Sequence, residues 1–115
     1  YALMQACKVV VSVAQNEPFG RGVVEALALG KPLVMTRGGG PEEIAGDCAA
    51  VQIVSDDPET IAAAMLAALK APPEWAKAAR TRADRFAAEM HHPQLLAIID
   101  SLLGPGAGPV SGANR

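Results

Sequence analysis

The amino-acid sequence predicts an α/β fold with a Rossmann-like parallel sheet and flanking helices. Three short apolar runs, at residues 8–14, 32–36 and 49–54, are each followed by a segment with helical character. The first run is rich in valine and does not alternate between apolar and polar residues, which is typical of a parallel strand covered on both faces. Strands that alternate with helices in this way favour a sheet with right-handed crossovers.

The first strand is followed by a loop at residues 15–20, which contains a proline. A short apolar helix is expected to begin at Gly20 or Arg21, to end at Leu29 and to be stopped by Gly30, because glycine is the usual residue just past a helix end.

The second strand leads into Gly38, Gly39 and Gly40, a run that predicts a turn or a loop where two segments of backbone approach closely. Residues 41–46 then predict a one-turn helix. Its first position is a proline, and two acids, Glu42 and Glu43, lie near the positive end of its dipole.

The third strand leads into a longer helix that is expected to run from Pro58 to about Lys70, with Asp57 as its N-cap. One face of this helix is expected to carry the apolar contacts, through Ile61, Met65, Leu66 and Leu69.

The C-terminal third of the sequence predicts two more helices. A charged helix is expected over residues 74–90, with Lys77, Arg80, Arg82 and Arg85 on a solvated face. Pro93 is expected to begin a last helix that reaches Leu103. Glycine, proline, serine and asparagine dominate residues 104–115, which are expected to form a disordered tail.

Composition restricts the class of protein. The chain has 115 residues, of which 50% are hydrophobic, and it carries a net charge of −2, which gives no basic footprint for nucleic acid. No signal peptide or apolar run of membrane-spanning length is visible, so we expect a cytoplasmic protein. The two cysteines are expected to be reduced. Because the chain opens on Tyr1 and predicts only three strands, we expect an N-terminally truncated domain at 1–103.

Ligands of open α/β sheets bind beyond the carboxyl ends of the strands, which here are the loops at residues 15–22, 36–41 and 55–58. In the first loop, Gly20 and Gly22 flank a helix start whose free amides favour an anion such as phosphate. Alternatively, these glycines only shape a tight turn between the strand and the helix.

Two carboxylates stand out near this helix start. Glu25 is the only charge in the apolar segment 23–29, and a carboxylate there suits the two hydroxyls of a ribose. The alternative is an acid that faces solvent and is stabilised by the helix dipole. Glu17 lies eight residues earlier, beside Pro18, and either binds sugar hydroxyls or is an exposed loop acid.

The ordered set of these residues resembles a known family. The segments 17–20 (Glu-Pro-Phe-Gly) and 25–34 (Glu-Ala-Leu-Ala-Leu-Gly-Lys-Pro-Leu-Val) resemble the Glu-x7-Glu motif of retaining GT-B glycosyltransferases of family four and their relatives. Residues 36–44 are similar to the family's Gly-Gly-Pro-Glu loop, and residues 57–59 open the next helix as in the family.

The resemblance implies a fold, an activity and a role for each matched residue. The chain would be part of the C-terminal, donor-binding domain of a GT-B enzyme that transfers a sugar from a nucleotide diphosphate with retention of configuration. Glu17 would contact the donor sugar as the catalytic-site carboxylate, and Glu25 would hold the ribose. The backbone amides of Phe19, Gly20, Arg21 and Gly22 would bind the sugar and the diphosphate.

The resemblance also implies that a metal ion and a cofactor are not needed, and that parts of the enzyme lie outside this chain. Retaining transfer in GT-B enzymes is expected to need no catalytic metal and no cofactor. The basic pair that neutralises the diphosphate and the acceptor-binding N-terminal domain lie upstream of the matched region, so this chain alone is expected to be inactive. Peripheral membrane association would come through that missing domain.

Two other functions fit some of the same residues. Gly20, Gly22 and a later Arg37 resemble part of a nicotinamide-binding fingerprint, although Glu25 replaces its third glycine. A nucleotide-binding or interaction module without activity is the other alternative. Neighbouring His91 and His92 point in different directions on a helix, so they do not predict a metal site.

Overall fold

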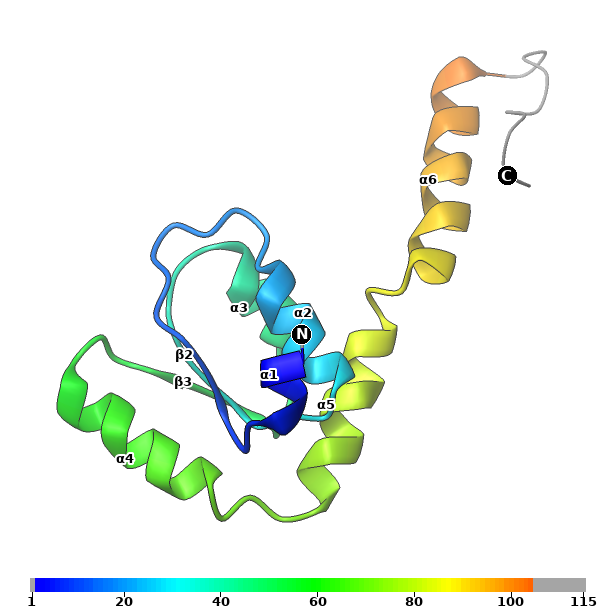
Figure 1. Ribbon diagram of the computed structural model, residues 1–115. Coiled ribbons are helices and arrows are strands. Elements are labelled where there is room, and N and C mark those ends of the chain that lie inside the picture. The colour runs from blue at the N-terminus through cyan, green and yellow to red at the C-terminus, as the bar shows by residue number, and fades with distance from the viewer. Residues whose placement is uncertain (1, 105–115) are drawn as a thin grey trace. The chain divides into compact units, whose positions relative to one another are not determined.

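The computed structural model describes residues 2–104, except for the side chains of residues 88–92. The described residues form two compact units, which are divided between Asp84 and Arg85. The first unit contains, in order, α1 (Ala2–Ala6), β1 (Val10–Ser12), α2 (Arg21–Ala28), β2 (Leu33–Thr36), α3 (Gly40–Ala45), β3 (Val51–Val54), α4 (Pro58–Ala68) and α5 (Glu74–Asp84) (Figure 1).

The three strands form a parallel sheet in the order β1-β2-β3. Val10 pairs with Leu33, and Leu33 pairs in turn with Val51. The predicted Rossmann-like parallel sheet with flanking helices is therefore confirmed. All three strands are shorter than predicted, because the residues at their ends belong to loops.

The central strand β2 forms the middle of the core. All four of its residues are buried, and Val34 packs with Ala64 and Ala68 of α4. Leu33 and Met35 point to the opposite face, since side chains alternate along a strand. Figure 1 shows α4 on one side of the strands and α2 and α3 on the other, so helices cover both faces of β2.

The predicted N-cap of α4 is confirmed, whereas the predicted packing face of this helix is wrong. The Asp57 side chain accepts a hydrogen bond from the Thr60 amide at 2.8 Å, as predicted for an N-cap. The predicted contact residues Met65, Leu66 and Leu69, however, are 38%, 64% and 53% exposed.

Alanines make the buried contacts of α4 instead, because Ala64 and Ala68 are buried while the larger side chains turn outward. The helix is apolar on nearly every side, so residue spacing alone does not select one face. Small side chains let the helix backbone come close to the sheet, and that close approach decides the orientation.

The charged helix is shorter than predicted, and one of its arginines is not simply solvated. α5 ends at Asp84 and buries Ala79 and Ala83. Arg82 donates from Nε to the Ile44 carbonyl and from Nη2 to the Glu43 carbonyl, both at 2.6 Å. These carbonyls lie in the last turns of α3, where they lack partners within the helix. The expectation of a solvated face is therefore wrong for Arg82.

The short helix α1 was not predicted, because five residues give no periodicity to detect. Its C-terminal end is held by Lys31, whose Nζ donates to the Gln5 carbonyl at 2.7 Å and to the Cys7 carbonyl at 2.8 Å. Cys7 and Cys48 are free thiols.

The second unit contains α6 (Ala88–Leu103), with Gly104 as its C-cap. The prediction that Pro93 begins this helix is wrong, because Pro93 lies inside it, in the second turn. A proline there removes one amide that would bond to the carbonyl four residues earlier, and the helix continues without that bond. Of the predicted tail at 104–115, Gly104 is described and the rest lies outside the described residues, as do the side chains of His91 and His92.

Candidate functional site

Three loops meet at the carboxyl end of the sheet. Glu17, after β1, and Gly39, after β2, form an isolated parallel bridge, and the Gly40 amide donates to the Glu17 carbonyl at 3.1 Å. The Gln15 side chain donates to a carboxylate oxygen of Asp56, after β3, at 2.7 Å. Both contacts join segments far apart in the sequence, as expected where parallel strands end at one edge.

A pocket of about 200 Å³ opens beside β1 and the start of α2. Its lining includes Glu17, Gly20 and Gly22, three of the residues predicted for a site. Its other walls are Ser12 and the apolar side chains of Met4, Val10, Val11, Val23 and Leu33. The pocket is therefore lined both by Glu17 and by residues at the start of α2.

The N-terminus of α2 has no side chain that caps it. Its N-cap, Gly20, adopts a left-handed conformation with φ of 94°, and no side-chain hydrogen bond closes the first turn. A Cβ at Gly20 would lie 2.7 Å from Cγ of Pro41, so the position requires glycine for both conformation and space. Uncapped amides at a helix N-terminus favour an anion.

Glu25 differs from the buried carboxylate that the sequence suggested. Its side chain is 37% exposed and lies 3.3 Å from Nε of Arg21, one turn earlier, whose side chain is 89% exposed. The carboxylate is thus accessible to a ligand, and its charge has a neighbour of opposite sign. Neither Glu25 nor Arg21 lines the pocket, and the Phe19 ring is 56% exposed outside it.

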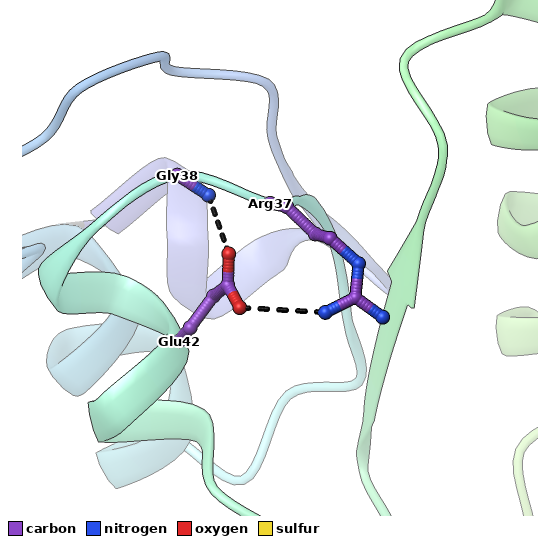
Figure 2. Close-up of polar contacts among 3 residues, drawn as sticks. All are labelled: Arg37, Gly38 and Glu42. Carbon is purple, nitrogen blue, oxygen red and sulfur yellow. Dashed lines mark hydrogen bonds and ion pairs between the residues drawn. The ribbon is translucent and has the colours of Figure 1, made fainter.

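Glu42 makes two contacts that the sequence did not predict. Its Oε1 accepts from the Gly38 amide at 2.7 Å, and its Oε2 lies 3.4 Å from Nη1 of Arg37 (Figure 2). The sequence placed Glu42 only near the positive end of α3. An acid two residues beyond a glycine run was the available signal, because such a side chain reaches back to the amides of the preceding loop.

Thr36, the last residue of β2, is a second polar group that the sequence did not single out. It is 3% exposed, and its hydroxyl has no hydrogen-bond partner among the described residues. Within those residues, no three side chains of the metal-ligating types gather at one place. No helix in the described part of the chain has the length and apolar character needed to span a bilayer.

Comparison with known proteins gives one match. A family model described as glycosyl transferases group 1 matches residues 1–87, which include α1 to α5 and every residue of the candidate site. No curated protein and no solved structure matches the chain.

Proposed function

From the premise that this chain belongs to the group 1 glycosyl transferases, we propose that it binds the donor of a sugar-transfer reaction. The donor is a nucleotide-diphosphate sugar, and transfer to the acceptor retains the configuration at the anomeric carbon. The Glu-x7-Glu pattern of Glu17 and Glu25 supports a position near family four of these enzymes.

One observation carries the proposal: the pocket that joins Glu17 to the uncapped N-terminus of α2. A carboxylate accepts hydrogen bonds from sugar hydroxyls, and free amides bind phosphate oxygens. A sugar diphosphate needs both kinds of partner side by side. The pocket holds about 200 Å³, below the roughly 300–1,000 Å³ of a site for a whole drug-sized ligand. It therefore suits the sugar or diphosphate part, with the nucleoside outside.

The matched residues take the following roles in this proposal. Glu17 contacts hydroxyls of the donor sugar as the catalytic-site carboxylate. The amides of Phe19, Gly20, Arg21 and Gly22 bind the sugar and the diphosphate, and Glu25 accepts hydrogen bonds from the ribose. Because negative charge grows on the departing diphosphate, amides already fixed around it stabilise the transition state more than the ground state.

The chain supplies the donor half of this reaction. Acceptor binding and the basic pair that neutralises the diphosphate belong to the rest of the enzyme in the family pattern, so we propose that the chain by itself binds donor without transferring sugar. Catalysis proceeds without a metal ion in this proposal, which follows the family pattern.

The experiment is amide NMR of the 115-residue chain titrated with UDP, GDP and ADP. We expect one base to shift the amides of residues 19–25 selectively. Glu25→Ala should weaken that binding by roughly tenfold or more, since a hydrogen bond to a charged group contributes about 1.5–3 kcal/mol. Glu59→Ala is the matched control, because Glu59 is a helix acid on α4, away from the pocket.

The titration discriminates between three results. Shifts confined to residues 19–25 and lost in Glu25→Ala support a nucleotide site and identify its base. Equal losses in the Glu25 and Glu59 variants would mean that the loss does not come from a ribose contact at Glu25. A dispersed spectrum that none of the three nucleotides changes would refute donor binding by this chain.

A further inference from the structure

The loop that follows β2 holds the backbone of the candidate site. The Gly40 amide donates to the Glu17 carbonyl at 3.1 Å, and the bridge between Glu17 and Gly39 lies directly beside it. A Cβ on Gly40 would lie 2.8 Å from the carbonyl carbon of Pro18, so the two main chains touch with no side chain between them. The position of Glu17 therefore depends on where residues 38–40 lie.

Residues 38–40 are held in turn by the carboxylate of Glu42. Of its two contacts, the one to the Gly38 amide is short, at 2.7 Å, and has an ionised acceptor, which places it among the stronger hydrogen bonds (Figure 2). The contact to Arg37 is longer, at 3.4 Å, and the Arg37 side chain is 75% exposed. Exposed ion pairs contribute little, so the Gly38 contact dominates.

We propose that Glu42 is a positioning residue for Glu17. Its carboxylate fixes the Gly38 amide, the Gly39–Gly40 backbone is fixed with it, and that backbone holds Glu17 at the wall of the pocket. Glu42 itself does not line the pocket, so it acts through the loop and not on a ligand. The functional part of this inference rests on the proposed donor site, because only then does the placement of Glu17 affect binding.

Three variants separate the possible contributions of Glu42. Glu42→Ala removes both contacts, whereas Glu42→Gln keeps an oxygen that accepts from Gly38 and loses the charge opposite Arg37. Glu43→Ala is the matched control, because Glu43 is the other acid in the first turn of α3 and its side chain is exposed. It tests whether any loss of helix-dipole stabilisation mimics the effect.

The first readout needs no ligand: hydrogen exchange of the Gly40 amide and the amide shifts of Glu17 and Gly38 in the free chain. In Glu42→Ala we expect the Gly40 amide to exchange about tenfold faster, as expected when a charge-assisted hydrogen bond worth about 1.4 kcal/mol is lost. Glu43→Ala should stay close to the unchanged chain, and Glu42→Gln should lie between it and Glu42→Ala, because a neutral oxygen accepts a weaker hydrogen bond than an ionised one. Equal exchange in Glu42→Ala and in the unchanged chain would overturn the proposal.

The second readout is the affinity of the same variants for UDP, GDP and ADP, which separates this inference from the proposed function. Weaker binding in Glu42→Ala, partly restored in Glu42→Gln, supports positioning of the site by Glu42. If the unchanged chain binds a nucleotide and Glu42→Ala binds it equally well, the positioning role fails while the donor site stands. If no nucleotide binds but Gly40 exchange still rises in Glu42→Ala, the contact with Glu17 stands and the proposed function fails.

If Glu42→Gln behaves like Glu42→Ala and Arg37→Met has the same effect, the proposal would also be overturned, because the ion pair with Arg37 would then hold the loop. Gly40→Ala is an independent variant: its Cβ would meet the Pro18 carbonyl group, so it should shift the same Glu17 amide by a different route. The exchange data on Glu42→Ala decide the matter even if Gly40→Ala does not fold.

Discussion

The N-termini of α2 and α3, which lie beside each other at the sheet edge, are stabilised differently from the N-terminus of α4. The N-terminus of α4 is closed by its own sequence: the Asp57 carboxylate accepts from the Thr60 amide at 2.8 Å and from the Ser55 hydroxyl at 2.7 Å. The N-cap residues of α2 and α3 are instead Gly20 and Gly39, and neither helix has a side-chain cap.

The contacts that hold α2 and α3 are long-range, whereas those at the start of α4 are local. Gly20 touches Pro41 across the two loops, and Arg82 closes the end of α3 from a helix 38 residues away. A cap made by the chain's own side chain occupies an amide that a ligand could otherwise bind. Amides without such a cap remain available, and the distant contacts replace the stability that a cap would give.

The largest loss of stability is expected for Gly20→Ala, which disrupts the contact between the starts of α2 and α3. Alanine at φ of 94° is strained, and its Cβ would lie 2.7 Å from Cγ of Pro41. We expect a loss of about 1–3 kcal/mol in the free energy of unfolding, measured by urea denaturation, together with loss of nucleotide shifts. A variant as stable as the unchanged chain would show that the Gly20–Pro41 contact is not a constraint.

A similar or slightly smaller effect is expected for Arg82→Met, which keeps an apolar stem and removes the hydrogen bonds to Glu43 and Ile44. Leaving two carbonyls at the end of α3 without this charged donor should cost about 1–3 kcal/mol in unfolding free energy. Lys77→Met is the control, since Lys77 is an exposed cation on the same helix. Equal losses for the two variants would indicate that helix charge, and not the contact with α3, matters.

The same division between local and long-range contacts explains what the sequence could predict. The Asp57 cap and the order of strands and helices depend on neighbouring residues and on hydrophobic runs, so they were predicted correctly. The Arg82 contact and the Glu42 contact depend on which segments the fold brings together. No local pattern encodes them, and for that reason the sequence predicts a solvated face where Arg82 in fact contacts α3.

The errors on α4 and α6 have different causes. On α4 the apolar residues surround the helix, so the pattern did not reveal that Ala64 and Ala68 face the sheet. On α6, the rule that proline begins a helix was applied to Pro93, but the helix starts five residues earlier. For the site, Glu17, Gly20 and Gly22 line one pocket, while the roles of all six site residues stay predictions.

Gly22→Ala is expected to have a smaller effect, and to affect binding rather than stability. A Cβ at Gly22 would meet nothing within 4 Å, and Gly22 lines the pocket. Replacing glycine inside a helix should leave the unfolding free energy unchanged or raise it by about 0.5–1 kcal/mol. A ligand that occupies the open space should bind about tenfold more weakly, as isothermal titration with the binding nucleotide would measure. A stability loss instead would assign Gly22 a structural role like that of Gly20.

The smallest effect is expected at the self-capped helix, where it should depend on pH. Hydrogen bonds from Thr60 and from the Ser55 hydroxyl lower the pKa of Asp57 below its ordinary value. Because the folded-state pKa is lower than the unfolded one, the cap's contribution is complete above the unfolded value of about 3.9 and is lost as pH falls through the folded value.

The difference in melting temperature between the unchanged chain and Asp57→Ala should therefore be constant from about pH 7 to pH 5 and shrink below about pH 4. Asp57→Asn keeps an oxygen that accepts from the Thr60 amide but cannot titrate in this range. Its difference from Asp57→Ala should stay constant over the whole range. If that difference also shrank at low pH, other carboxylates would be responsible, and the start of α4 would no longer be stabilised chiefly by its own local cap.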